Sequence, residues 1–586
     1  MKVAIVRDPL YGYIELSPIE EAILSRPVVQ RLHRITQNGL ACLTYPSNRT
    51  SRFAHSLGAM HIAGAMLKNA ILDSHDGPTA PSSVITSFTK QLERECENRN
   101  LGAWQHKDLT KQASRGYWSR LGFSNHVHVV AWQGIRLACL LHDLGHLPFS
   151  HTPEVVLKAL MRDVPEIVQR LDALRKALRQ KYKLHEERAL HEMIGVWLSL
   201  DVLEPDAADL RDSSINKLLE QSLKLAQLIL LEDSGKKSAL GALHTLIDGE
   251  VDADRADYVL RDALTSGVME IGNYDLDRII HCTQLRKDQG CFRFQASERA
   301  LHAIEGFCLA RFRMWRALVF QTNVVRSELA LSRLLYLAGK LGNDVNGVPR
   351  RVIEAIHSSG IAKLWEVFDK DSNRPLRSGQ FVGLDEPLLF TAMRSLLSGI
   401  DTTDIHSSSG LREFYVYLRF VLDRDKSRMV ALWKRIEDYR DFAKYYVGAI
   451  TGFRKTKDPV RRMNEHLKAR LGQSVGKHGD PIGAARGIEK RVMKKLGNDH
   501  SVIRLAFHMD LDPSLGGYRV ATENGSVSLQ DLSPIFQSTL TAWESDVHFH
   551  AFNVLLDGDL QEESHARKIK PKELAPVLAE CVEAWK

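Results

Sequence analysis

The strongest constraint on this chain is an apolar helix that runs directly into a row of ionisable side chains. Residues 126–143 read HVHVVAWQGIRLACLLHD, and Gly145 and Pro148 then end the helical pattern. Charged groups at the end of a buried helix are costly unless they pair or bind a metal ion. An imidazole beside a carboxylate suits a divalent first-row metal. We therefore expect His142 and Asp143 to act together inside a helical core.

Other segments can supply the further ligands that such a metal would need. Neighbouring residues on a helix point about 100° apart, so two of them share an ion only if other elements also reach it. His55 lies near the start of the helix that apolar spacing predicts over 51–72. Asp254 lies in an acidic segment that opens another helix. Asp252 and Asp257 compete with it for a metal role, and spacing alone does not choose among the three.

The chain is long enough for more than one structural unit, because single cores stop growing at about 250–300 residues and this sequence has 586. An extended segment with a turn is expected over 1–16, and Ser17 then opens a helix with the pattern of a capping box. β-branched runs and turn signals predict a small sheet within 501–529. Further helical patterns cover 153–199, 210–232, 252–264 and 299–338. The expected fold class is mainly α.

Residues 74–125 break the helical pattern. The stretch SHDGPTAPSS is rich in turn-forming residues, and the stretch that follows it is polar. We interpret this segment as an insertion or a mobile loop.

Composition excludes several classes of protein. Hydrophobic residues make up 44% of the chain, but no apolar run approaches the roughly 20 residues that span a bilayer. Asp8 and Pro9 interrupt the N-terminus before a signal-peptide core could form. The seven cysteines are scattered and include no CxxC pair, which argues against a disulfide framework or a thiolate zinc site. We expect a cytoplasmic protein that makes no membrane contact.

The positive charge is concentrated near the C-terminus. The formal charge is +7, and residues 451–500 contain 13 Lys or Arg against 5 Asp or Glu. Such a region suits polyanions, meaning nucleotides or nucleic acid. Few aromatic residues are interleaved, which weakens the case for single-stranded nucleic acid. We favour an effector or subunit contact over nucleic-acid binding, and a solvated helical face is the structural alternative.

Four motifs in order carry a resemblance to a known family. They are RFAHSLG at 52–58, LLHDLGHLPFSH at 140–151, HEE at 185–187 and VDADRADYVLRD at 251–262. The series resembles the HD-domain deoxynucleoside triphosphate triphosphohydrolases, which include bacterial dGTPases and the animal enzyme with a sterile-alpha-motif domain. The resemblance covers roughly residues 1–340, apart from the 74–125 segment.

The resemblance implies a role for each matching residue. A divalent metal (Mn, Fe, Mg or Zn) would be held by His55, His142, Asp143 and Asp254. His151 would be the general acid or its close partner, supported by Glu154 and His185, and His146 would lie close to the α-phosphate. The phosphates would meet Arg52, Arg255 and Arg311. The sugar would be bound at its 3′-hydroxyl by Gln37 and Asp262 and packed against Tyr258, which would crowd a ribose 2′-hydroxyl.

The same resemblance implies an organisation and a reaction. An HD-domain helical core over 1–340 would be followed by a C-terminal helical region, 341–586, that makes oligomer or effector contacts. Dimers, tetramers or hexamers are expected, and so is regulation by a nucleotide at a second site. The expected reaction is metal-dependent hydrolysis of a deoxynucleoside triphosphate, with dGTP as the first substrate to test, to a deoxynucleoside and inorganic triphosphate. A role in antiviral defence is compatible with that reaction.

Two other functions remain open at this point. One is an HD phosphodiesterase or nuclease that acts on nucleic acid or on a signalling nucleotide. The other is a nucleotide-sensing scaffold whose site has lost activity, although the presence of all the expected metal ligands argues against it. Release of intact triphosphate distinguishes the expected reaction from the first alternative, and the metal content of the purified protein tests the second.

Overall fold

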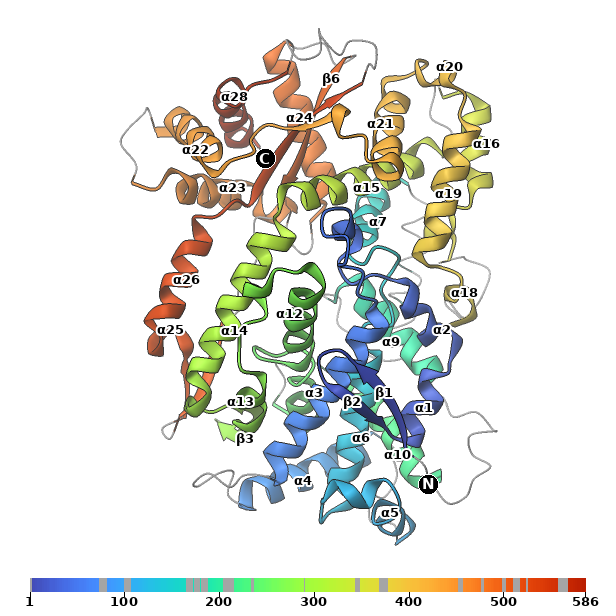
Figure 1. The fold of residues 1–586 in the computed structure, drawn as a ribbon, viewed down its shortest axis with the longest axis vertical. Coiled ribbons are helices and arrows are strands. Elements are labelled where there is room, and N and C mark those ends of the chain that lie inside the picture. The colour runs from blue at the N-terminus through green and yellow to red at the C-terminus, as the bar shows by residue number, and fades with distance from the viewer. Residues whose placement is uncertain are drawn as a thin grey trace.

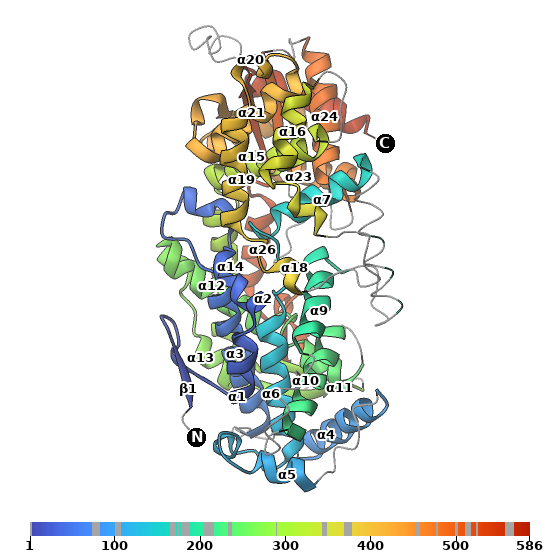
Figure 2. The ribbon, with the colours of Figure 1, turned by 90° about the vertical axis from the view of Figure 1, so that its right-hand side faces the viewer.

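The computed structural model shows an elongated molecule (Figures 1 and 2). The residues that it describes are 3–72, 82–99, 107–164, 172, 176, 180, 188–203, 216–232, 237–288, 290–342, 348–367, 378–451, 457–475, 479–497, 502–509, 517–522, 525–556 and 568–585. Helices dominate and the sheets are small and antiparallel, so the predicted mainly-α fold class is confirmed.

The elements fall into two sets along the chain. The helices up to residue 341 are α1 (Pro18–Leu24), α2 (Pro27–Gln30), α3 (Arg52–Leu72), α4 (Ser82–Glu97), α5 (Lys107–Ala113), α6 (His126–Leu141), α7 (Thr152–Asp163), α9 (Leu190–Val202), α10 (Asn216–Leu231), α11 (Ala239–His244), α12 (Ala253–Ser266), α13 (Leu276–His281), α14 (Leu301–Met314) and α15 (Thr322–Leu341). The later helices are α16 (Arg350–Ser359), α17 (Lys363–Glu366), α18 (Ser378–Phe381), α19 (Glu386–Gly399), α20 (Thr402–Ile405), α21 (Ser409–Asp423), α22 (Ile436–Thr451), α23 (Pro459–Val475), α24 (Pro481–Leu496), α25 (Leu529–Leu532), α26 (Pro534–Glu544) and α28 (Pro571–Glu583). The strands are β1 (Ala4–Asp8), β2 (Gly12–Leu16), β3 (Thr283–Asp288), β4 (Cys291–Ala296), β5 (Met429–Ala431), β6 (Ile503–Met509), β7 (Arg519–Thr522), β8 (Gly525–Ser528) and β9 (Phe549–Leu555).

The chain begins with the predicted extended segment and capped helix. β1 and β2 form an antiparallel hairpin in which Ala4 lies opposite Leu16. Ser17 and Glu20 form a capping box at the start of α1, each side chain accepting the other residue's backbone N–H. The Glu20 carboxylate also pairs with Arg136 of α6 at 2.7 Å, and both side chains are buried. Through this ion pair, the capping residue Glu20 also attaches the N-terminal segment to the buried helix α6.

α3 and α6 pack together at the centre of the lower half of the molecule (Figure 1). Every residue of α6 from Val127 to Leu141 is buried, which agrees with its almost continuous apolar sequence. α10 covers another side of α6, and α12 packs on α3. This arrangement brings the end of α6 and the starts of α3 and α12 to one place.

The interpretation of residues 74–125 as a mobile loop is wrong for the described part of that segment. α4 packs on the core through Phe88, Leu92 and Cys96, which are fully buried and spaced four residues apart. The Glu95 carboxylate accepts two backbone N–H groups at the start of α11. The turn-forming residues precede this helix, and its apolar face then drives packing against the core. The other interpretation of the segment, an insertion, stays a prediction.

α14 and α15 connect the lower and upper parts of the molecule (Figure 1). The helical pattern predicted over 299–338 is interrupted, because α14 passes into a π-helical turn, Trp315–Val319. Gln321 then caps α15 by accepting the N–H groups of Asn323 and Val324. α15 packs against α7 on one side and α21 on another.

The C-terminal part of the chain is built around a three-stranded antiparallel sheet with the order β5-β9-β6. The strands β6, β7 and β8 lie in or at the edge of the predicted 501–529 tract. β9 was not predicted, because its sequence FHAFNVL is buried along its whole length and shows no polar alternation. Helices α22, α23, α24 and α28 complete a second hydrophobic core around this sheet.

The larger hydrophobic core extends through the lower half and includes residues of α16, α19 and α21, beyond residue 340. A division of the chain at that residue stays a prediction. None of the described helices combines the length and apolar character that a bilayer span requires.

Candidate active site

Four predicted metal ligands meet where α3, α6 and α12 converge. His55 lies in the first turn of α3, His142 caps the end of α6, Asp143 follows it, and Asp254 lies in the first turn of α12. His55 Nε2 is 2.9 Å from Asp254 Oδ1 and 3.5 Å from Asp143 Oδ2. His142 Nε2 is 3.4 Å from an oxygen of each carboxylate. We call these four residues the His-Asp cluster.

The two histidines present the same nitrogen to the centre of the cluster. His142 Nδ1 lies 2.6 Å from the carbonyl oxygen of Cys139, and His55 Nδ1 lies 2.8 Å from Asp257 Oδ2. A carbonyl or carboxylate oxygen can only accept, so each Nδ1 carries a proton, and each Nε2 offers a lone pair to a metal once the ring is neutral. Both Nε2 atoms are buried and neither is aligned for a hydrogen bond. This is the arrangement of a histidine whose outer nitrogen is fixed and whose inner nitrogen binds a metal.

The donor set fits a divalent cation. Two imidazole nitrogens and two carboxylates could hold one, and His55, His142 and Asp254 have donor atoms within 4.8 Å of one another. Burial disfavours a charged imidazole, but the Asp254 and Asp257 carboxylates outweigh it and raise the pKa of His55 to about 10. Without a cation the cluster therefore carries protons, which a metal displaces when it binds.

The structure distinguishes among the three acidic residues that spacing left open. Asp252 is the N-cap of α12, where it accepts the Arg255 backbone N–H at 2.7 Å. The Asp257 carboxylate accepts from His55, from Arg261 at 2.7 and 2.8 Å, and from the Tyr11 hydroxyl at 2.8 Å. Among the three, Asp254 is the residue whose carboxylate faces both histidines.

A glycine allows this contact between α3 and α12. A Cβ added at Gly58 would lie 1.8 Å from Asp257 Oδ1 and 2.4 Å from the Arg261 guanidinium. A larger residue at this position of the RFAHSLG motif would displace the carboxylate that orients His55.

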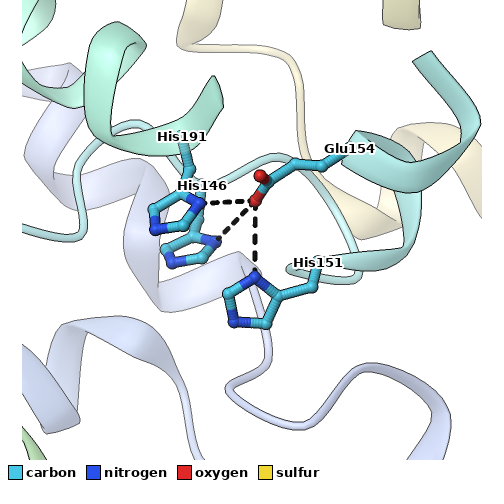
Figure 3. Close-up of side chains that lie close together, drawn as sticks. All are labelled: His146, His151, Glu154 and His191. Atoms are coloured by element: carbon cyan, nitrogen blue, oxygen red, sulfur yellow. Dashed lines mark hydrogen bonds and ion pairs between the residues drawn. The ribbon is translucent and has the colours of Figure 1, made fainter. Parts of the chain in front are cut away.

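A second cluster lies beside the first (Figure 3). Its members are His146, His151, Glu154 and His191, which we call the Glu154 cluster. His191 Nδ1 lies 2.6 Å from Glu154 Oε1, and His151 Nδ1 lies 3.4 Å from the same oxygen. The His146 ring stacks on His191 with centroids 4.1 Å apart, and His146 Nε2 is 3.2 Å from Asp143 Oδ1. His146 therefore joins the two clusters.

The loop before α7 holds these residues in an uncommon backbone conformation. Phe149 and Ser150 have φ angles of 65° and 58°, a left-handed region that residues other than glycine rarely adopt. The Phe149 N–H donates to Glu386 Oε1 at 3.2 Å, and the Ser150 hydroxyl donates to the Thr36 carbonyl at 2.6 Å. These bonds fix the loop, and the His151 side chain that follows is 67% exposed.

Charge in the Glu154 cluster is distributed unevenly. Burial and the nearby Arg52 hold the pKa of His146 well below its usual value, so this imidazole is neutral. Burial disfavours the Glu154 carboxylate, but His191 and His151 outweigh it and hold its pKa well below the usual range. Glu154 is thus an anion that orients the exposed His151 ring. Such a pair can hold and deliver a proton.

His191 is the member that sequence reasoning missed. The prediction assigned the supporting role to His185, which lies outside the described residues. His191 reaches Glu154 because α9 packs directly on the motif: a Cβ at Gly145 would lie 2.0 Å from the His191 carbonyl oxygen. The only sequence signal is a histidine in the first turn of an apolar helix, which by itself is not specific.

Among the predicted phosphate-binding residues, Arg52 contacts the His-Asp cluster directly. Its guanidinium donates to Asp143 Oδ2 and to the Ser150 hydroxyl, and the side chain is buried. Arg255 is instead paired with Asp252 on its own helix. Arg311 is buried and donates to the Tyr518 hydroxyl, a contact from the C-terminal part of the chain that the sequence did not indicate.

The predicted sugar-binding residues lie close to the same place. The Tyr258 ring is 6.4 Å from the His55 ring. Gln37 Oε1 and Asp262 Oδ1 are buried without hydrogen-bond partners. Burial raises the pKa of Asp262 to about 7, although a hydrogen bond from Asn38, next to Gln37, works against it. Buried polar atoms without partners are rare in proteins and suit a ligand.

Comparison with known proteins gives distant relatives. No family model matches the chain. YwfO, an uncharacterized protein of Bacillus subtilis, is 25% identical over 342 residues, which are 58% of this chain and 57% of that protein. An uncharacterized protein of Methanocaldococcus jannaschii is 24% identical over 329 residues, 56% of this chain and 48% of that protein. The chain thus spans about half the length of these relatives.

A relative with a named activity matches a shorter segment. The human deoxynucleoside triphosphate triphosphohydrolase SAMHD1 is 27% identical over 147 residues, 25% of this chain and 16% of that protein. A solved structure of a phosphohydrolase from Bacteroides thetaiotaomicron aligns with 94% of this chain and 100% of that one, at 18% identity and a TM-score of 0.49. The chain is a distant homologue of SAMHD1, and together with the His-Asp cluster this homology supports an HD-type phosphohydrolase.

Proposed function

We propose that this protein hydrolyses deoxynucleoside triphosphates in a metal-dependent reaction that yields a deoxynucleoside and inorganic triphosphate. The observation that carries the proposal is the His-Asp cluster, in which two buried Nε2 atoms without hydrogen bonds and two carboxylates face one point. Arg52 contacts that cluster and the Glu154 cluster adjoins it. The combination provides a cation site, a phosphate-binding guanidinium and a proton donor.

His55, His142, Asp143 and Asp254 would hold the cation. A divalent ion there would supply positive charge beside a phosphate and lower the pKa of water towards about 7. Asp257 and the Cys139 carbonyl keep the two imidazoles in the orientation that binding requires.

His151 is the proposed proton donor. In the reaction, a bond forms between a water oxygen and the α-phosphorus, and the bond from that phosphorus to the 5′-oxygen breaks. The departing 5′-oxygen needs a proton, and the exposed His151 ring, oriented by Glu154, can deliver one. His146, neutral and buried between the two clusters, would lie close to the α-phosphate.

The substrate contacts follow from charge and shape. Arg52 would stabilise negative charge on the phosphate oxygens, with Arg311 and Arg255 further along the triphosphate. Gln37 and Asp262 have the buried acceptors that a sugar 3′-hydroxyl could satisfy. Tyr258, beside His55, would crowd a 2′-hydroxyl and so favour deoxynucleotides.

Product analysis tests the proposal. Purified protein is incubated with Mn²⁺ or Mg²⁺ and each of the dNTPs, alone and mixed, beside an Asp143→Ala variant. Deoxynucleoside and intact triphosphate, absent from the variant, are the expected products, and dGTP is the first substrate to try. Turnover only in the mixture would indicate an activating nucleotide. Absence of triphosphate under every condition would contradict the proposal, and single-stranded DNA and RNA would then test the phosphodiesterase alternative.

A further inference from the structure

The Glu154 cluster directs three imidazole nitrogens at one carboxylate oxygen (Figure 3). The Nδ1 atoms of His191, His151 and His146 lie 2.6, 3.4 and 3.9 Å from Glu154 Oε1. One oxygen does not need three such neighbours to be satisfied. A single cation bound between the four residues explains why all three rings point to the same place better than one or two hydrogen bonds do.

The protonation pattern of His146 leaves a lone pair inside this cluster. Its Nε2 lies 3.2 Å from Asp143 Oδ1. Because the carboxylate can only accept, Nε2 carries the proton and Nδ1 carries the lone pair. His146 Nδ1 is buried and has no hydrogen-bond partner. A histidine that donates from one nitrogen to a carboxylate and binds metal through the other is a recurrent feature of metal sites.

The donor set matches a four-coordinate cation. With metal–ligand bonds of about 2.0–2.1 Å, the donors of a tetrahedral zinc site lie about 3.3–3.4 Å apart. Of the three distances to Glu154 Oε1, the one from His191 is shorter than this separation, the one from His151 equals it and the one from His146 is longer. All four donor atoms lie within 4.8 Å of one another. Three imidazoles and one carboxylate are ligands that Zn²⁺ accepts readily.

The surroundings fix three of the ligands and leave the fourth accessible. His146, Glu154 and His191 are largely shielded from solvent, and α9 is held against the motif at Gly145. The His151 side chain is 67% exposed, so a cation can enter past it. Binding would displace the proton that His191 Nδ1 shares with Glu154 and separate these two atoms, which lie 2.6 Å apart.

We propose that His146, His151, Glu154 and His191 form a second divalent-cation site, for which Zn²⁺ is the best-matched ion. Binding there takes up the His151 ring and withdraws it from the substrate, so occupancy of this second site inhibits hydrolysis. The inhibitory part of the inference rests on the proposed function, whereas the binding part does not.

Zn²⁺ binding to the purified, metal-free chain tests the inference without any activity assay. Calorimetry and metal analysis after gel filtration should give one fewer Zn²⁺ per chain for His191→Gln than for the unmodified protein. Asp254→Asn should also lose one Zn²⁺, from the other cluster, and the double variant should lose both. His406→Gln changes an exposed histidine outside both clusters and should bind as the unmodified protein does.

A second variant tests whether a loss of Zn²⁺ binding in His191→Gln is caused by misfolding. Because the His151 side chain is largely exposed, His151→Gln should leave the fold intact and still weaken the same Zn²⁺ site by at least tenfold. Unchanged Zn²⁺ stoichiometry and affinity in both His191→Gln and His151→Gln would overturn the inference.

An activity titration separates this inference from the proposed function. With rising Zn²⁺, triphosphate release should increase and then fall. Because His191 also supports the proton donor, each protein is compared with its own maximal rate, and the falling part should move to at least tenfold higher Zn²⁺ in His191→Gln. A protein that binds the second Zn²⁺ but releases no triphosphate would retain the site and refute the proposed function. Inhibition that is identical in both proteins would refute the regulatory part.

Discussion

Two sets of buried ionisable side chains differ in how their charge is balanced. In the upper part of the molecule, α15, α21, α24 and β6 contribute a network of Arg333, Glu413, Arg486, Glu489 and Arg504, which we call the guanidinium network. In this network Arg333 Nη2 lies 2.6 Å from Glu489 Oε1, and Arg486 Nη1 lies 3.1 Å from Glu413 Oε1. In the His-Asp cluster, carboxylates face the lone-pair nitrogens of two imidazoles.

The difference indicates which set is structural and which is functional. A guanidinium is always protonated, so each carboxylate of the guanidinium network has a permanent cation beside it and needs no metal ion. Imidazole nitrogens and carboxylates are both electron-pair donors when deprotonated. In the His-Asp cluster Arg52 pairs with Asp143, but the second carboxylate, Asp254, faces the two imidazoles and is balanced by protons on them or by a cation. Burial alone does not distinguish the two sets, but the chemistry of the positive partner does.

The largest expected effect comes from removing a charge from the His-Asp cluster. Asp254→Asn keeps the size of the side chain but weakens a ligand, so Mn²⁺ binding and triphosphate release should both fall to background. The Asp254 side chain is 30% exposed, and circular dichroism should show an unchanged fold. Asp248→Asn, a nearby carboxylate that is 64% exposed, is the matched control. Full Mn²⁺ binding by Asp254→Asn would contradict the assignment.

Breaking the guanidinium network should affect stability instead. Glu413→Gln leaves Arg486 and Arg504 without their anionic partner, and loss of one member of a buried ion pair costs about 3–5 kcal/mol. Urea unfolding should show this loss, while Mn²⁺ affinity measured on the folded protein should not change. A matching fall in Mn²⁺ affinity would mean that the two sets are not independent.

A smaller effect is expected from a residue that supports the His-Asp cluster without belonging to it. Asp257 accepts from His55 Nδ1 and is itself held by Arg261. Asp257→Asn weakens that orientation, and removal of such an outer partner costs about 10–100-fold in metal affinity. Electron paramagnetic resonance of Mn²⁺ measures the change. Affinity equal to that of the unmodified protein would show that His55 does not depend on this partner.

The smallest expected effect concerns a residue that lies beside the cluster and bonds to none of its members. Tyr258→Ala should lower the preference for dNTP over NTP by roughly tenfold, because steric exclusion of one small group is worth about 1–3 kcal/mol. Mn²⁺ affinity should stay the same. Comparison of kcat/KM for dGTP and GTP measures the preference, and an unchanged ratio would exclude a role for Tyr258 in sugar selection.

Much of the His-Asp cluster could be predicted from the sequence, because the apolar helix before His142 and Asp143 dictates their burial. Spacing alone could not choose Asp254 over Asp252 and Asp257, since that choice depends on which residue caps α12; in the sequence it rested on the family resemblance. His191 was missed because its role depends on the packing of α9 against Gly145. Contacts of this kind lie far apart in the sequence and leave no periodic pattern.

In the fold, too, some elements could be predicted from local sequence and others could not. The extended segment with its turn, the capping box at Ser17 and the long helices follow from local patterns and were predicted. Helix α4 was not predicted, because turn-forming residues precede it, although Phe88, Leu92 and Cys96 have helical spacing. β9 pairs with β5, more than a hundred residues earlier in the chain, and local sequence cannot indicate such a partner.

The most direct test of the account is a single titration of metal-free protein with Mn²⁺ in the presence of dGTP, in which bound Mn²⁺ and released triphosphate are measured together. If the His-Asp cluster holds the ion that supports hydrolysis, triphosphate release begins only as Mn²⁺ binds and rises with the occupancy of the tightest site. Asp254→Asn should then show neither Mn²⁺ binding at this tightest site nor triphosphate release. Triphosphate release by the metal-free protein, or by Asp254→Asn at the full rate, would contradict the account.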